Sequence, residues 1–178
     1  MQNHESCVHA SGAAAGAATG AGSASAAQGL YNALFMDHVN HPDWCFEMTD
    51  ASISHTGVNP SCGDELVFYL KINDQGIIEE ASYQGHGCAI SQASADMMSD
   101  CIIDKSADEA RALCGLFGRM IRAELTSEDD IQDLSDASLL KDISHMPARV
   151  KCAELAWNTL QEMLTPKTKA LLHGYPFL

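Results

Sequence analysis

The chain has 178 residues, of which 46% are hydrophobic and 19% are charged, a composition typical of a globular domain with a sizeable buried core. Its 10 Lys and Arg residues against 24 Asp and Glu residues give a formal net charge of −14. This acidic excess argues against proteins that follow nucleic-acid phosphates and against binding to anionic membrane surfaces. We therefore expect no nucleic acid and no membrane among the partners of this protein.

Residues 1–28 form a low-complexity tract of Ala, Gly and Ser, which we expect to be a disordered tail. The tract is too weakly hydrophobic to span a bilayer. No Lys or Arg precedes Lys71, so the basic region of a secretory signal or a transit peptide is missing. The seven cysteines are odd in number and widely spaced, unlike the disulfide framework of a small secreted domain. These features predict a cytoplasmic protein.

The folded domain is expected to span residues 29–168, with a C-terminal tail over residues 169–178. Apolar side chains at helical spacing predict a first helix from near Leu30 to His38. Pro42 then ends this helix, because a residue before proline is disfavoured in the helical conformation.

A hairpin is predicted next. Apolar and polar residues alternate over residues 65–72, the turn sequence Asn73–Gly76 follows, and residues 77–83 can return antiparallel. A weaker strand over residues 48–55 would complete a three-stranded antiparallel sheet.

After Gly87 the period of the apolar residues changes from two to 3.6, which predicts helices over residues 88–103 and 108–122 and a final helix opened by Pro147. The acidic segment 124–142 between them is interpreted as a solvated face, with a docking element for a partner protein as the alternative. Strands followed by helices indicate an α+β fold, in which helices pack on a three-stranded antiparallel sheet.

Three cysteines, Cys62, Cys88 and Cys152, stand where one predicted element passes into the next. The positive end of a helix dipole and neighbouring basic side chains favour the thiolate at Cys88 and Cys152. Asp64 lies two residues after Cys62 on the same turn, and its carboxylate suits zinc as a fourth ligand. Because the sequence has no Cys-x-x-Cys pair, spacing alone leaves ordinary core thiols as the alternative interpretation.

The remaining cysteines have surroundings that do not suggest chemistry. Cys7 lies in the N-terminal tract, and Cys45 lies in a loop where it can be exposed or packed. Cys101 and Cys114 lie in amphipathic helices, where a free thiol behaves as a small apolar group. His86 could replace Asp64 as a ligand, but a His between two glycines is more often a loop residue.

Three segments resemble signature segments of the iron–sulfur cluster assembly scaffold family, the IscU and NifU N-terminal type. They are Asn59–Asp64, Gly85–Ser91 and Ala148–Trp157. The resemblance runs from about Leu30 to about Leu164 and thus covers the predicted domain. It implies an α+β fold with a three-stranded antiparallel sheet, in agreement with the pattern of elements.

Two features make the chain most similar to the SufU branch of this family. IscU-type scaffolds have a His immediately before the third cysteine, where this chain has Lys151, and a shorter interval between the second and third cysteines. The resemblance implies that Cys62, Asp64, Cys88 and Cys152 bind zinc. It further implies that Cys62 accepts sulfur from a SufS-like cysteine desulfurase, and that downstream iron–sulfur assembly proteins are further partners.

Two alternatives remain open at this point. The same four residues could assemble and transfer an iron–sulfur cluster, although Lys151 weakens this alternative because an amine is a poor ligand for soft metals. The zinc could also be purely structural. Arg149 is a candidate group beside the site, and pairing with a nearby acid is its equally simple interpretation.

Overall fold

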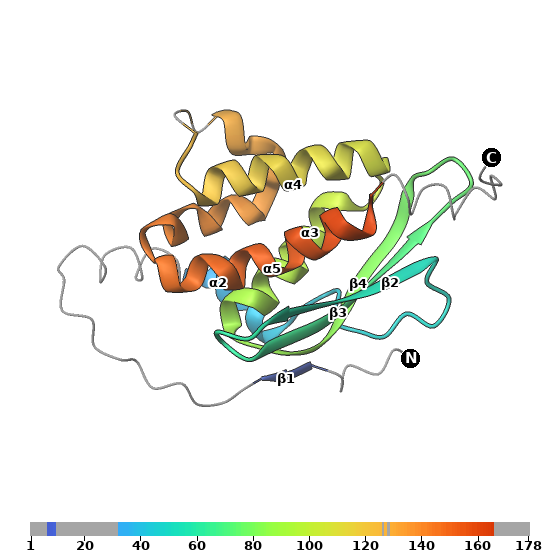
Figure 1. The fold of residues 1–178 in the computed structure, drawn as a ribbon, viewed down its shortest axis with the longest axis horizontal. Helices are drawn as coiled ribbons and strands as arrows, with labels where there is room; N and C mark the ends of the chain where they lie inside the picture. Colours follow the sequence, from blue (N-terminus) through green and yellow to red (C-terminus); the bar gives the residue numbers. More distant parts are fainter. Residues whose placement is uncertain (1–6, 10–31, 126, 128, 166–178) are drawn as a thin grey trace.

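The structure is a computed structural model, and it describes residues 7–9, 32–125, 127 and 129–165. Helices cover one face of a β-sheet (Figure 1). In chain order the elements are β1 (Cys7–His9), α2 (Ala33–Asn40), β2 (Ile53–Asn59), β3 (Asp64–Ile72), β4 (Ile78–Gly87), α3 (Ala89–Ile102), α4 (Ala107–Ile121), the 3-10 helix η2 (Asp129–His145) and α5 (Pro147–Met163).

The predicted three-stranded antiparallel sheet is confirmed, because β2 pairs with β3 and β3 pairs with β4, both antiparallel. β1 adds a short parallel strand beside β4, so the strand order is β1-β4-β3-β2 and β2 is an edge strand. β1 lies inside the tract that was expected to be a disordered tail. The rest of that tract and the C-terminal tail over residues 169–178 lie outside the described residues.

Two strand boundaries differ from the prediction. The weak strand expected over residues 48–55 is β2, which begins at Ile53 and ends at Asn59. Most of its side chains are exposed, so no apolar alternation marks it in the sequence. β4 continues through the glycine-flanked His86, because Gly85 has a φ of 132° and a Cβ there would overlap the carbonyl oxygen of Glu65.

The helices form two layers above the sheet (Figure 1). α3 and α5 pack directly on the strands, and α4 and η2 pack on these two helices. Phe117 of α4 stacks on Trp157 of α5 with ring centroids 4.4 Å apart, and the Trp157 indole donates to Ser94 of α3 at 3.2 Å. These contacts hold the N-terminal ends of α3 and α5 at the same end of the sheet. No helix in the described ranges is long and apolar enough to cross a membrane.

The acidic segment was expected to be a solvated face, and this holds for only one side of it. Its carboxylates lie mostly on the surface, but an apolar side chain at every third position is buried. These buried residues are Ile131, Leu134, Ala137, Leu140 and Ile143. A spacing of three matches the 3.0 residues per turn of a 3-10 helix, so one face of η2 joins the core. Ser135, at a φ of 46°, kinks the segment.

A buried histidine ties η2 to two other helices. His38 of α2 contacts Asp96 of α3 through Nδ1 at 2.7 Å and Asp136 of η2 through Nε2 at 3.3 Å. The backbone N–H of Trp44 donates to the other Asp96 oxygen at 2.9 Å, and its indole donates to Asp100 at 2.6 Å. The hydrogen bond to Asp96 and the second one to Asp136 outweigh burial and raise the pKa of His38 to about 9.

The contact between His38 and Asp96 predicts that the free energy of unfolding depends on pH. A folded-state pKa above the unfolded value of 6.5 means that protonated His38 stabilises the fold below pH 6.5, and that this contribution is lost as the pH rises to about 9. We expect His38→Gln to lower the free energy of unfolding by about 1–3 kcal/mol at pH 6, with a smaller loss at pH 9.5. Urea unfolding at a series of pH values measures this difference.

His41→Gln is the matched control, because His41 is exposed and pairs only with the exposed Asp37 four residues earlier. It should leave the free energy of unfolding nearly unchanged. An effect of His38→Gln that stays constant from pH 6 to pH 9.5 would contradict the charged pair.

Candidate metal centre

The turn between β2 and β3 places two of the predicted ligands. The Asn59 carbonyl accepts from the N–H groups of Cys62 at 3.2 Å and Gly63 at 2.9 Å, and its side-chain oxygen accepts from the Ser61 N–H at 3.2 Å. Gly63 has a φ of 71°, a left-handed conformation that favours glycine. The turn therefore leaves Cys62 exposed at its tip and directs Asp64 into the protein.

Asp64 is fully buried and forms the centre of the cluster. Its carboxylate accepts a hydrogen bond from the Asn59 side-chain amide at 3.0 Å and one from the Cys88 backbone N–H at 2.8 Å. Within the described ranges no Lys, Arg or His forms an ion pair with it. A buried carboxylate that lacks a counter-charge is costly, so the site is suited to a cation.

Cys152 lies in the second turn of α5 and is also fully buried. Its Sγ lies 3.0 Å from the Cys62 Sγ, and the Asn59 amide donates to it at 3.3 Å. One ligand atom from each of Cys62, Asp64 and Cys152 lies within 4.8 Å of the others. Ligands of one tetrahedral zinc ion lie about 3–4 Å apart, so these three atoms fit a shared ion with little rearrangement.

Cys88 is brought to the same place as the N-cap residue of α3, where it is partly buried. A hydrogen bond from Cys152 lowers the pKa of Cys88 to about 6, although burial opposes this, and the Ser91 N–H assists. The same contact, together with burial and the nearby Cys62, raises the pKa of Cys152. The three thiols therefore cannot all lose their protons easily without a nearby positive charge. A divalent cation would supply that charge.

Arg149 lies one turn before Cys152 and directs its guanidinium to the site. Its Nη1 donates to the Cys62 Sγ at 3.7 Å. In the described part of the chain it forms no ion pair with an acid, so the geometry favours its interpretation as a group beside the site. His86 is exposed on β4 opposite Glu65 and does not belong to the ligand cluster.

The other cysteines described lie away from this site. Cys101 and Cys114 are buried, and burial raises the pKa of each thiol to about 12. Cys101 also donates to the Leu134 carbonyl at 3.0 Å, which ties α3 to η2. Cys45, which the sequence left as either exposed or packed, is buried and disulfide-bonded. Of the four predicted ligands, Cys62, Asp64 and Cys152 form one compact group, and Cys88 adjoins it through its N–H bond to Asp64 and its contact with Cys152.

Sequence analysis missed Asn59 as a functional residue. It was considered only as the first residue of the segment Asn59–Asp64, but it closes β2 and its buried amide donates to both Asp64 and Cys152. A signal existed, because an Asn five residues before a buried acid can reach back across a tight turn. The sequence does not show that α5 packs close to Asn59, where its Cys152 is the second acceptor for the amide.

A three-stranded antiparallel sheet with helices on one face, and three cysteines and an aspartate gathered at one end, defines the NifU-like N-terminal class of domain. Residues 30–165 match the family described as NifU-like N terminal domain, and the chain belongs to this family. The resemblance to the IscU, NifU and SufU proteins is thereby confirmed.

Relatives and solved structures agree with this assignment. The chain is 38% identical over 135 residues to the iron–sulfur cluster assembly scaffold protein IscU of Thermotoga maritima, covering 76% of this chain and 92% of that protein. It is 36% identical to the zinc-dependent sulfurtransferase SufU of Bacillus subtilis, covering 75% and 88%. A SUF-system scaffold structure from Fervidobacterium islandicum AW-1 superimposes with a TM-score of 0.69 at 32% identity, covering 76% and 97%.

The role of Asn59 can be tested by substitution. Asn59→Leu keeps the branched shape of the side chain but removes the donor to Asp64 and Cys152. We expect metal affinity to fall by about 10–100-fold, because groups that orient metal ligands have effects of this size. Competition with a chromophoric chelator measures the affinity, and Asn158→Leu on the exposed face of α5 is the control. Equal affinities for the two variants would contradict the assignment.

The buried cysteines outside the cluster provide a second test. Cys101→Ser and Cys114→Ser should retain full metal content, with a packing cost of about 1 kcal/mol in the free energy of unfolding. Cys152→Ser should lose most of the metal. Metal content per chain, measured by elemental analysis, distinguishes these outcomes, and loss of metal from either control would show that the ligand set is wrong.

Proposed function

We propose that the protein is a zinc-dependent sulfur acceptor in iron–sulfur cluster assembly, which receives persulfide sulfur from a cysteine desulfurase. The observation that carries the proposal is the contrast between the exposed Cys62 thiol and the buried Asp64 and Cys152 against which it lies. A reactive thiol at the mouth of a buried ligand set suits a protein that must take up a group from a partner.

The donor set supports zinc as the metal. Three thiolates and one carboxylate, supplied by Cys62, Cys88, Cys152 and Asp64, are ligands that tetrahedral zinc accepts. Zinc bound there would keep the thiolates deprotonated at neutral pH. The relative in Bacillus subtilis is named a zinc-dependent sulfurtransferase, which favours this metal for the present chain as well.

Cys62 is the residue that we propose accepts the sulfur. Its thiolate attacks the outer sulfur of the desulfurase persulfide, the sulfur–sulfur bond of that persulfide breaks, and the desulfurase cysteine leaves as a thiolate. The product is a persulfide on Cys62, so no oxidant or reductant is consumed. The Arg149 guanidinium, with Nη1 at 3.7 Å from Sγ, stabilises the negative charge on sulfur before and after the transfer.

The other ligands are held too firmly to take part in transfer. Cys152 is fully buried in α5, and Cys88 is fixed by its N–H bond to Asp64. Cys62 is attached to the protein through a turn whose hydrogen bonds are local to residues 59–63. It can therefore move toward a partner while the other three ligands stay in place.

The functional unit that we propose is the domain over residues 29–168, whose extent is supported by the family match to residues 30–165. Its partners would be a cysteine desulfurase of the SufS type and downstream iron–sulfur assembly proteins, and its compartment the cytoplasm. We expect neither nucleic acid nor membrane to bind the acidic surface.

A scaffold that assembles an iron–sulfur cluster on the same residues is the second candidate. It is favoured by the relative from Thermotoga maritima, which is named a cluster assembly scaffold and shares 38% identity. The two candidates differ in metal content, because a scaffold purified without oxygen should contain iron and sulfide, whereas a sulfur acceptor should contain one zinc ion per chain.

The sulfur-acceptor proposal predicts a persulfide on one residue. Incubation with a cysteine desulfurase and cysteine should place the extra sulfur on Cys62, located by mass spectrometry of peptides. Cys62→Ala should abolish sulfur acceptance while keeping part of the zinc through the other three ligands, and Cys114→Ala should behave as the unaltered protein. A persulfide found on Cys88 or Cys152 with Cys62 unmodified would overturn the assignment.

The ligand roles predict a graded loss of metal. Cys88→Ala and Cys152→Ala should empty the site and lower the melting temperature, because metal binding stabilises a fold whose ligands come from separate elements. Asp64→Ala should have a milder effect on zinc content, since water can occupy the vacated position. Zinc analysis and thermal unfolding of the same samples test this order.

A further inference from the structure

The sulfurs of Cys62 and Cys152 lie in direct contact at the candidate metal centre. Their Sγ atoms are 3.0 Å apart, although the two residues are separated by 90 positions in the sequence. Groups that react with each other inside a protein approach to about 3–3.5 Å beforehand. A disulfide bond is about 2 Å long, so a shift of about 1 Å would join these two sulfurs. The pair is therefore placed for a reaction between its members.

The two thiols of this pair differ in what they can meet. Cys62 is exposed at the tip of its turn, whereas Cys152 is fully buried in α5. A sulfur atom that a partner adds to Cys62 therefore arrives from the solvent side, and Cys152 contacts Cys62 from the inner side. Exchange at sulfur needs this arrangement, because the entering and leaving sulfurs lie on opposite sides of the sulfur that is attacked.

A persulfide on Cys62 would contain two sulfurs, and the distances favour attack by Cys152 on the inner one. The inner sulfur is the Cys62 Sγ itself, at 3.0 Å from the Cys152 Sγ. The outer sulfur would be attached through a bond of about 2 Å directed to solvent, which places it farther from Cys152. Attack on the outer sulfur would only move it to Cys152, whereas attack on the inner sulfur expels the outer one.

Two neighbouring groups support this arrangement. The Asn59 amide donates to the Cys152 Sγ at 3.3 Å and holds the buried sulfur at the turn that carries Cys62. The Arg149 Nη1 donates to the Cys62 Sγ at 3.7 Å. The same guanidinium would lie beside a sulfur that leaves Cys62 with a negative charge and would stabilise that charge.

The other described cysteines are less well placed to attack Cys62. Cys88 does not belong to the compact group of ligand atoms that contains Cys62 and Cys152. Cys101 and Cys114 are buried away from the site, and Cys45 is disulfide-bonded. Among the described cysteines, Cys152 is therefore the one positioned to attack a persulfide on Cys62.

We propose that Cys152 is a resolving thiol, which releases the sulfur of a Cys62 persulfide as hydrosulfide when Cys152 is not bound to a metal. The Cys152 sulfur bonds to the Cys62 Sγ, the bond from this Sγ to the outer sulfur breaks, and the outer sulfur leaves with the bonding electrons. The proton that Cys152 gives up goes to the leaving sulfur. The Cys152 sulfur is oxidised to the level of a disulfide and the outer sulfur is reduced, so no further reductant is consumed.

This inference rests on the proposed sulfur acceptance by Cys62 and adds a second fate for the sulfur. A Cys152 thiolate bound to zinc shares its electron pair with the metal and is a poor nucleophile. The zinc-loaded protein would therefore keep the persulfide for a partner, whereas the metal-free protein would discharge it. A discharged chain has a disulfide in place of two ligands, so a thiol–disulfide exchange must reduce it before it binds metal again.

Removal of zinc from a persulfide-loaded chain tests this release. The zinc-loaded protein is incubated without oxygen with a cysteine desulfurase and cysteine, purified from both, and treated with EDTA. We expect release of hydrosulfide about tenfold or more faster than after treatment with EDTA that is already saturated with zinc. The hydrosulfide released should equal the persulfide lost, and mass spectrometry of peptides should find Cys62 and Cys152 joined by a disulfide.

Two serine variants distinguish the resolving thiol from a general effect of metal loss. Cys88→Ser removes one ligand but keeps Cys62 and Cys152, so it should release hydrosulfide without EDTA. Cys152→Ser also removes one ligand but should retain the persulfide on Cys62. Both are loaded with sodium tetrasulfide, which transfers sulfur to an exposed thiol without a desulfurase, and the excess is removed by desalting. Cys114→Ser should behave as the unaltered protein.

The outcomes separate this inference from the proposed function. A Cys62 persulfide that survives EDTA treatment would overturn the resolving role of Cys152 and leave sulfur acceptance intact. If the desulfurase places no sulfur on Cys62, the proposed function is contradicted, and EDTA treatment of the tetrasulfide-loaded unaltered protein still tests the release. A disulfide from Cys62 to Cys88 or between two chains would also overturn the inference, as would equal release from Cys152→Ser and Cys88→Ser.

Discussion

The buried Asp64 carboxylate is the interaction on which the arrangement of the site depends. Its desolvation must be offset, and the two hydrogen-bond donors that reach it come from different elements, the side chain of Asn59 and the backbone N–H of Cys88. The Asn59 amide also reaches Cys152 in α5. One carboxylate therefore links the end of β2, the start of β3, the start of α3 and the first turns of α5. When both hydrogen bonds to Asp64 are formed, the residues that we propose as metal ligands therefore lie close together.

Local signals were sufficient to predict the elements that present these ligands. Pro147 opens α5, the change in apolar period begins α3 at Cys88, and the Asn73–Gly76 turn joins β3 to β4, all as the sequence indicates. These signals act over a few residues and do not depend on the rest of the fold. The gathering of three cysteines is different, because it depends on the packing of α3 and α5 on the sheet. Spacing alone left that question open, and the family resemblance supplied the expectation.

The features that sequence analysis missed are those that depend on distant partners. Asn59 acquires its role only because Cys152 approaches it from a position 93 residues later. His38 was interpreted as part of an apolar helix stripe, but it pairs with Asp96 and Asp136 across three elements. The apolar period of three in the acidic segment is visible in the sequence. It was overlooked because the carboxylates dominate the composition and long 3-10 helices are uncommon.

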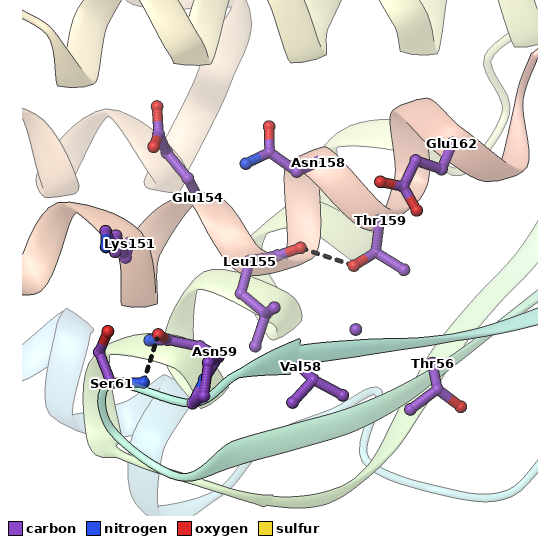
Figure 2. A pocket seen from close by; sticks show the side chains of 12 residues that line it. Thr56, Val58, Asn59, Ser61, Lys151, Glu154, Leu155, Asn158, Thr159 and Glu162 are labelled. Atoms are coloured by element: carbon purple, nitrogen blue, oxygen red, sulfur yellow. Dashed lines mark hydrogen bonds between the residues drawn. The ribbon is translucent and has the colours of Figure 1, made fainter.

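The two faces of α5 connect the metal centre with a groove of about 330 Å³ that lies between this helix and β2 (Figure 2). Arg149 and Cys152 point from its first turns to the sulfur cluster, whereas Lys151, Glu154 and Glu162 line the groove. Because Cys62 lies on the turn where the groove ends, a protein that reaches its thiol must also contact this end of α5.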